Sequence, residues 1–394
     1  MNSFLGNEFA NFLMHPVTKV SVVVVYLAVL GVAVMGIVDL EQGLATVNLT
    51  PDDSYYRTYD QRYDEDVYEN YGVYVHVAID ETLDYTDAAV RQRITDLRTS
   101  FQDSNYFRDG TGSWISWLDF YLIFLSQAGQ DVDSMDMPTF ISVLQTQFFA
   151  QDNFQFYEAD IVINSDATQI TQSRFFVQST NLFDSNDEQE MMLEARDLAD
   201  DSTLEVVVYA YPFPFFDQYV VILPNTLQTL GIAVASMLVV SLILIPSLST
   251  VVWVTLATIS ICACVIGYMS LWDVSLNSVS MINLVMSIGF SVDFAAHISY
   301  HYVISPTDVP RERVRDALGY LGTPIVQGAL STIIGVLALS AADTYIFRTF
   351  FKLIFMVMVF GFLHAMFLLP VLLSTLNRGL CRTMPCCKNN KVEA

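Results

Sequence analysis

Asp293 is a carboxylate in the middle of a long apolar run, residues 279–304. A charge at the centre of a bilayer costs about 2.5–3.5 kcal/mol on insertion scales, so such residues are rare and mark ion paths or proton relays. Gly289 and His297 lie four residues to either side, on the same helix face. We therefore predict that Asp293 and His297 form a proton or cation relay, with Gly289 giving a neighbouring helix room to approach. The alternative is a structural acid that is hydrogen-bonded to a neighbouring helix.

A second polar pattern lies in the next apolar run, residues 323–342. Gln327, Ser331 and Gly335 recur every four residues and form one small, polar helix face. We expect this stripe to mediate tight helix packing, with ligand contact as the alternative. In the last run we expect His364 to bond a backbone carbonyl and Lys352 to extend towards the membrane surface.

Sequence signatures of the common enzyme classes are absent. The sequence contains no G-x-S-x-G elbow, no G-x-x-x-x-G-K-[ST] loop and no H-E-x-x-H pair. Residues 41–218 contain His76 as their one histidine and no cysteine, so they can form neither a Cys-His dyad nor a zinc site. We predict no enzyme activity, no cofactor and no metal, and an ion gradient as the energy source.

The elements that must position these residues are membrane helices. A span requires about 20 predominantly apolar residues. The chain has six such runs and is therefore expected to be a polytopic α-helical membrane protein. The runs are residues 17–38, 226–245, 250–272, 279–304, 323–342 and 350–373.

Charge is distributed unevenly along the chain. Of the 42 acidic residues, 33 lie in residues 41–218, with eight Arg and no Lys, so this segment should repel nucleic acid. Basic residues of short loops stay in the cytoplasm. We therefore place both termini in the cytoplasm and residues 39–218 outside the cell or in a lumen. The basic residues that decide this orientation are Lys19, Arg311, Arg313, Arg315, Arg378, Arg382, Lys388 and Lys391.

Residues 39–218 are predicted to form one α+β domain. Alternating strands at 72–80, 159–164, 169–178 and 204–209, with helices at 87–101 and 186–200, give the order βαββαβ of a ferredoxin-like fold. A helical insert, about residues 104–158, is rich in aromatic residues. They are expected to form its core, or else to line a lipid path or a partner surface. The remaining predicted parts are an interfacial amphipathic helix at 1–16, the first span at 17–38, a five-helix bundle at 219–376 and a cytoplasmic tail at 377–394.

Several local features complete the prediction. Pro212, Pro214 and Pro224 are expected to break the structure before the second span. Asn48 starts the sequon Asn48-Leu49-Thr50, a predicted glycosylation site. Cys262 and Cys264 are expected to be buried packing residues. The cysteines that follow the last span are candidates for palmitoylation; they are Cys381, Cys386 and Cys387.

Several stretches, taken together, resemble the C-terminal half of Patched-related proteins, in the resistance-nodulation-division superfamily that also holds Dispatched and the Niemann-Pick type C sterol transporter. The strongest is GFSVDFAAHISY, residues 289–300. The others are Gly43-Leu44, Leu49-x-Pro51-Asp52-Asp53-Ser54-Tyr55, FDQYVVILPNTLQ (216–228), GALSTIIGVLALS (328–340) and LHAMFLLPVLLS (363–374).

The resemblance implies that the first span is the family's seventh and that residues 41–218 are its second ectodomain. It also implies that Asp293 is the acid of a Gly-x-x-x-acid motif tied to cation or proton coupling. The family's first half has no counterpart in these residues, so the chain is expected either to be a piece of a longer protein or to assemble with a separate half or a second copy. The ectodomain also lacks the cysteines of disulfide-bearing relatives.

Two functions follow as expectations. The first is half of a sterol or lipid transporter, driven by a proton or sodium gradient through Asp293, in the plasma membrane or an endosomal membrane. The second is a receptor or sterol-responsive signalling regulator whose ectodomain binds a secreted ligand. A third reading, a packing partner without transport, leaves the intramembrane acid without a role.

Overall fold

The computed structural model describes residues 1–44, 46–68, 71–110 and 112–376. The chain divides into two compact units, which are described separately below. One unit contains Met1–Ser54 together with Val221–Ala394, and the other contains Tyr55–Val220.

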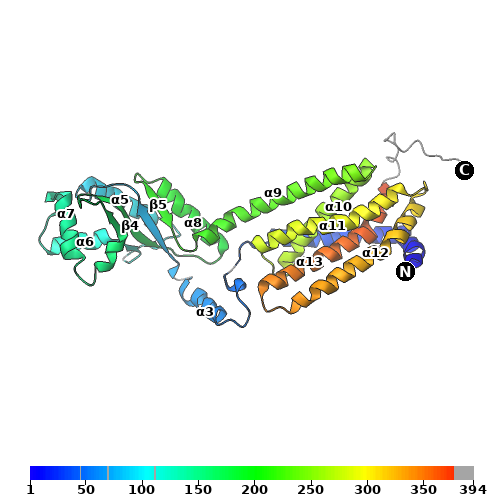
Figure 1. Cartoon of the computed structure of the whole chain (residues 1–394), viewed down its shortest axis with the longest axis horizontal. Helices are drawn as coiled ribbons and strands as arrows, with labels where there is room; N and C mark the ends of the chain where they lie inside the picture. The colour runs from blue at the N-terminus through cyan, green and yellow to red at the C-terminus, as the bar shows by residue number, and fades with distance from the viewer. Residues whose placement is uncertain (45, 69–70, 111, 377–394) are drawn as a thin grey trace. The chain divides into compact units, whose positions relative to one another are not determined.

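Within the described residues, six helices are long and apolar enough to cross a membrane, as the sequence predicts. The helices α10 and α13–α14 are mostly buried among the others, whereas α2, α9 and α12 are largely exposed. Figure 1 shows α10, α11, α12 and α13 running side by side. The spans are α2 (Pro16–Val38), α9 (Phe213–Leu244), α10 (Leu248–Leu271), α11 (Ser278–Ile304), α12 (Pro310–Leu337) with η7 (Ala338–Ala341), and α13 (Tyr345–Leu363) with η8 (His364–Leu368) and α14 (Leu369–Leu376).

Two of the three prolines before the second span do not break the structure, so the prediction was wrong for Pro214 and Pro224. Pro212 lies in a turn directly before α9. Helix α9 begins at Phe213 and continues through Pro214 and Pro224. Pro214 lies in the first turn, where a backbone N–H has no partner within the helix, so its missing donor costs nothing there. Pro224 lies further inside and leaves a carbonyl one turn earlier without its usual donor. About three and a half turns of α9 therefore precede the apolar run that the sequence indicates.

The packing of α2 against α10 depends on two glycines. A Cβ atom added to Gly36 would lie 2.1 Å from the carbonyl oxygen of Gly267, and one added to Gly267 would lie 2.0 Å from that of Ala33. Small residues let helix backbones approach closely in membranes, where dispersion contacts replace the hydrophobic effect. These glycines thus set the distance between the first span and the rest of the bundle.

The N-terminal segment forms η1 (Phe4–Phe9) and α1 (Ala10–Leu13) and packs along α12. Leu5 and Leu13 are buried, and a Cβ atom at Gly6 would lie 3.1 Å from the Cα atom of Gly319. The predicted helical segment is therefore attached to the bundle. Its location at the membrane interface remains a prediction.

The unit Tyr55–Val220 is built on a small antiparallel sheet in an α+β arrangement (Figure 1). The strand order is β2-β4-β1-β5, and β3 also pairs with β4. The two-residue strand β2 comes from the predicted insert and was not expected. The strands are β1 (Tyr74–Ile79), β2 (Trp114–Ile115), β3 (Ile161–Ile163), β4 (Ile170–Gln178) and β5 (Val206–Tyr209).

Helices of this unit begin at acidic or hydroxyl caps, because a side-chain oxygen there accepts the free N–H groups of the first turn. Asp87, Ser116, Asp136 and Asp184 fill this role. Part of the high acidic content is thereby structural. The helices are α3 (Tyr55–Tyr63), η3 (Asp64–Tyr68), α5 (Ala88–Gln102), α6 (Trp117–Gln127), η4 (Val132–Ser134), α7 (Met137–Val143), η5 (Leu144–Phe148), η6 (Gln155–Asp160) and α8 (Ser185–Asp200).

Most aromatic residues of the insert form its own core. The rings of Phe148 and Phe154 stack with centroids 4.5 Å apart, and Tyr121 donates a hydrogen bond to the carbonyl of Phe140 over 2.8 Å. Trp117 and Tyr121 are fully buried, whereas Phe156 is exposed. Most of these aromatic residues therefore serve as the core of the insert, and they do not form a continuous apolar lining.

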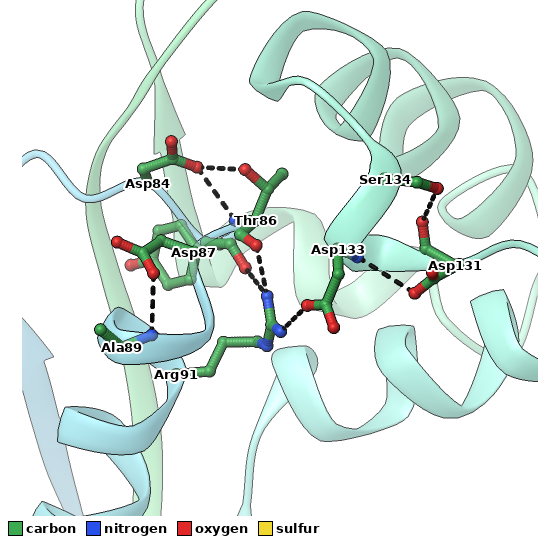
Figure 2. Close-up of polar contacts among 9 residues, drawn as sticks. Asp84, Thr86, Asp87, Ala89, Arg91, Asp131, Asp133 and Ser134 are labelled. Atoms are coloured by element: carbon green, nitrogen blue, oxygen red, sulfur yellow. Dashed lines mark hydrogen bonds and ion pairs between the residues drawn. The ribbon is translucent and has the colours of Figure 1, made fainter.

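Arg91 in α5 ties this helix to the insert (Figure 2). Its guanidinium donates to the carbonyls of Tyr85 and Thr86, at 3.0 and 2.7 Å, and to the carboxylate of Asp133 in η4. Asp131 caps η4 by accepting from the N–H of Asp133. The acidic residues in this region are thus used in caps and in an ion pair with Arg91.

Candidate functional site

The predicted relay residues lie together on one exposed face of α11. Asp293, His297 and Gly289 are all exposed. Among the described residues neither Asp293 nor His297 has a hydrogen-bond or ion-pair partner, and no neighbouring group lies within 4 Å of the place that a Cβ would take at Gly289. The room that Gly289 offers is therefore not used by any described helix of this chain.

The opposite face of α11 is its core face, and it carries polar residues that sequence reasoning missed. Asn283, Ser287 and Ser291 are buried and lie four residues apart. Ser287 donates to the carbonyl of Asn283 over 2.8 Å, and Ser291 donates to the carbonyl of Ile288 over 3.0 Å. Their spacing, the same as that of Gly289, Asp293 and His297, is the signal that could have identified them. The acid is thus turned away from the inside of the bundle.

The polar stripe of α12 is also exposed. Gln327, Ser331 and Gly335 face away from the bundle, and no neighbouring group lies within 4 Å of a Cβ position at Gly328 or Gly335. The stripe therefore does not pack against any described helix of this chain, and its predicted role in tight helix packing stays a prediction. The face that packs inward instead contains Leu318, Gly322, Ile325 and Ala329.

Asp293 in α11 and Gln327 in α12 lie at about the same depth along their helices. The rings of His301 in α11 and Tyr320 in α12 stack with centroids 5.0 Å apart and mark one level of these neighbouring antiparallel helices. At a rise of about 1.5 Å per residue, Asp293 lies about 12 Å and Gln327 about 10.5 Å beyond that level. Tyr320 is 69% exposed, and Gln327 follows it by nearly two full turns on the same face. We group these exposed residues of the two neighbouring helices, Asp293, His297, Gln327 and Ser331, under the name mid-span patch.

The mid-span patch contains the groups that a proton or cation site requires but no protein wall opposite them. A carboxylate and an imidazole one turn apart can share a proton, and the amide and hydroxyl can orient water or an ion. In hydrocarbon, however, each of these groups would lack a hydrogen-bond partner, at a cost of several kcal/mol. No cluster of three His, Cys, Asp or Glu residues suited to a metal occurs in the described part of the chain.

A second polar site lies inside the bundle, where Tyr26 and Ser260 were not predicted. The hydroxyl groups of Tyr26 in α2 and Ser260 in α10 are 2.8 Å apart, and Ser260 Oγ lies 3.1 Å from His364 Nε2. His364 Nδ1 lies 2.8 Å from the carbonyl oxygen of Phe360. Because a carbonyl accepts, Nδ1 carries the proton and Nε2 accepts from Ser260. His364 therefore bonds a backbone carbonyl, as predicted, and joins three spans.

The remaining predicted positions lie apart from these sites. Asn48 is half-buried in η2 (Thr46–Leu49), and its glycosylation stays a prediction. Cys262 and Cys264 are buried, in agreement with a packing role. The candidates for palmitoylation lie outside the described residues; they are Cys381, Cys386 and Cys387.

Comparison with known proteins shows which proteins this chain is similar to. No family model matches the chain. It is 28% identical to a Niemann-Pick type C1-related protein of Toxoplasma gondii over 379 residues, which is 95% of this chain. It is 29% identical over 362 residues, 91% of the chain, to Patched-related protein 9 of Caenorhabditis elegans. The chain is a homologue of the Patched-related and Niemann-Pick type C1 proteins. The family predicted from the sequence is thus confirmed.

Further comparisons delimit what this homologue contains. It is 26% identical to the NPC intracellular cholesterol transporter 1 of Sus scrofa, over 94% of its own length. It spans 31–41% of the length of these three curated relatives. The hedgehog release protein Disp of the water bear Hypsibius dujardini shares the fold, with a TM-score of 0.61 at 14% identity, over 91% of this homologue and 48% of that chain.

Proposed function

We propose that the chain is one half of a sterol or lipid transporter that couples to a proton or sodium gradient through Asp293. The observation that carries this proposal is the mid-span patch. Asp293 and His297 are exposed and share a helix face, and Asp293 lies at about the depth of Gln327 on the neighbouring helix. The names of the relatives, which include a cholesterol transporter, support a sterol or another lipid as the substrate.

The half-transporter role follows from the cost of leaving the patch uncovered. Polar groups near the bilayer centre face a bundle interior or a water-filled cavity. The mid-span patch faces neither within the described residues of this chain. A second membrane bundle, from a separate half or another copy, would cover it and create the enclosed site that coupling needs. The relatives are two to three times longer, which agrees with this role.

The proposal also includes the location of the domain, its fold class and its glycosylation. We place residues 39–218 outside the cytoplasm, in the plasma membrane or an endosomal membrane, on the basis of the basic residues at the other side of the bundle. We assign a ferredoxin-like domain, supported by the antiparallel order β5-β1-β4-β3 and by helices α5 and α8. Glycosylation at Asn48 would appear as a mass decrease in Asn48→Gln.

The test is gradient-dependent lipid movement by Asp293→Asn. Cells that express the chain and support its activity are loaded with a fluorescent sterol, and its export is measured with and without ionophores. Because Asn retains the shape but cannot ionise, export by the variant should fall to the ionophore-treated level. Asp316→Asn serves as the control, since Asp316 is an acid on α12 that accepts a hydrogen bond from Ser305 outside the patch. Export that is unchanged in Asp293→Asn would refute the coupling.

The rival function, a receptor that binds a secreted ligand, is favoured by one observation in the unit Tyr55–Val220. The sheet face away from the buried residues Val75 and Val77 carries Phe176, His76 and Tyr209 in one row across three strands. Tyr209 is exposed and the other two are half-buried. Aromatic residues are enriched at protein interfaces. For a receptor, Tyr209→Asp should abolish the response while Asp293→Asn leaves it intact. For a transporter, Asp293→Asn should abolish lipid export while Tyr209→Asp leaves it intact.

A further inference from the structure

A cavity of about 300 Å³ lies between α10 and α13, on a part of the bundle that is separate from the mid-span patch. Its walls are aromatic and aliphatic. The residues that form them include Tyr268, Trp272, Phe355, Met356, Val359 and Phe360. The volume is at the lower end of the range of small-molecule sites, which is about 300–1,000 Å³. It is large enough for one hydrocarbon chain but not for an entire two-chain lipid.

The cavity lies at one end of the spans. Trp272 directly follows α10, and Lys352 lies in the third turn of α13. Tryptophan at the end of a span is typical of the membrane interface, where lipid headgroups begin. An opening at this level gives a lipid chain access from the bilayer while its headgroup stays at the surface.

One cation lies at the rim of the cavity. The Lys352 ammonium donates to the carbonyl of Trp272 over 2.7 Å and lies 5.8 Å from the centre of its ring. Among the described residues it has no carboxylate partner within 4.0 Å. An ammonium has three N–H donors, so donors remain for a ligand oxygen. The nearby Arg348 is instead engaged by Asp52 through two hydrogen bonds.

We propose that this cavity binds one acyl chain of a phospholipid, whose phosphate oxygens accept hydrogen bonds from Lys352. The apolar walls exclude a headgroup from the cavity itself, and the ammonium at its rim matches a phosphate in charge and in depth. This inference deepens the lipid-handling role proposed above and rests on it for its biological meaning. The binding itself requires neither a gradient nor the mid-span patch.

The test uses the full chain in vesicles with a photoactivatable phosphatidylcholine that carries a diazirine near the end of one chain. Labelled peptides are located by mass spectrometry. A diacylglycerol probe with the same chain lacks the phosphate. Val359→Trp fills the cavity, Lys352→Gln removes the cation and Lys352→Arg retains it. Leu256→Trp is the matched control, because Leu256 is an exposed residue of α10 that does not line the cavity.

Labelling of the peptides that contain residues 268–272 and 355–360 is expected in the wild type. Val359→Trp should reduce it for both probes, and Leu256→Trp should not. Lys352→Gln should weaken phosphatidylcholine labelling about tenfold, as for the loss of one charge-assisted hydrogen bond, with no change for diacylglycerol. Lys352→Arg should restore it. Thermal unfolding of each variant checks that a loss of labelling does not reflect loss of the fold.

Labelling that resists Val359→Trp, or that is no stronger than labelling around Leu256, means that only annular lipid is present and overturns the proposal. Competition by cholesterol but not by phospholipid, with no effect of Lys352→Gln, overturns the phosphate assignment. Asp293→Asn should label like the wild type. A chain that loses export in that variant but keeps labelling supports both proposals, whereas export without labelling contradicts the cavity site alone.

Discussion

Ser260 holds three helices of the bundle together through one hydroxyl group. It lies 2.8 Å from the hydroxyl of Tyr26 and 3.1 Å from Nε2 of the buried His364. Ser260→Ala removes the donor to His364 and should lower the free energy of unfolding by about 0.5–2 kcal/mol. Thermal unfolding in detergent measures this change. Ser236→Ala, at an exposed serine that bonds its own helix, should be neutral. Equal stability of both variants would contradict the network.

We expect His76 to make the stability of the domain of residues 55–220 depend on pH. Burial, and the charge of the nearby Arg174, lower the pKa of His76, against a smaller opposing effect of Asp160. The unfolded chain, with a pKa of about 6.5, therefore binds the proton first. The stability that neutral His76 contributes is fully present when the pH is above the pKa of the unfolded chain, and it is lost as the pH falls below that pKa. His76→Gln should reduce the difference in proteolytic resistance of the domain between pH 7.5 and 5.5; an unchanged difference would argue against this role.

Single residues differ in how far their roles could be predicted. Asp293 could be recognised from the sequence as a candidate functional residue, because a carboxylate in an apolar run is rare and has few explanations. Its exposure on the outside of the bundle could not, because either face of α11 could have turned inward: both carry polar residues at four-residue spacing. Ser260 and Tyr26 gave no signal, since isolated hydroxyl residues are common in spans and acquire meaning only from a partner on another helix.

Helices were the most predictable elements, and their ends were the least. Apolar length decides that a segment spans, but it does not decide where a helix begins. Helix α9 begins at Phe213 and α12 at Pro310, each 13 residues before the predicted apolar run. Both extensions contain polar residues that a helix outside the hydrocarbon tolerates. The strand β2 was missed because two residues carry no measurable alternation.

The close contact of α2 with α10 gives a prediction at the scale of elements. Gly36→Ala places a Cβ atom 2.1 Å from the carbonyl oxygen of Gly267, so the two helices must move apart. Overpacking of this kind costs about 1–3 kcal/mol. Gly31→Ala is the control on the same helix, since no neighbouring group lies within 4 Å of its Cβ position. The midpoint temperature of thermal unfolding in detergent should be lower in Gly36→Ala and unchanged in Gly31→Ala. A similar decrease in both variants would disprove the close contact.

At the scale of the whole molecule, the bundle buries some polar groups and leaves others uncovered. Asn283, Ser287 and His364 are buried among its helices, whereas Asp293, His297 and Gln327 are exposed. Water would solvate the three exposed groups on a soluble protein, but the hydrocarbon of a bilayer does not. The sequence predicted a functional acid; that no described helix of this chain covers it could emerge only from the packing of α11 and α12. The proposed function requires a further protein surface over the mid-span patch.

Lipid accessibility beside Asp293 in native membranes is the measurement that tests this requirement most directly. A nitroxide is attached at Phe290→Cys, on the exposed face of α11, and at Val252→Cys, on an exposed face of α10, with the remaining cysteines replaced by Ser. If a second bundle covers the patch, oxygen dissolved in the hydrocarbon should relax the label at 290 far less than the label at 252. Equal relaxation at the two positions would mean that the face of Asp293 is open to lipid, and the half-transporter account would be wrong.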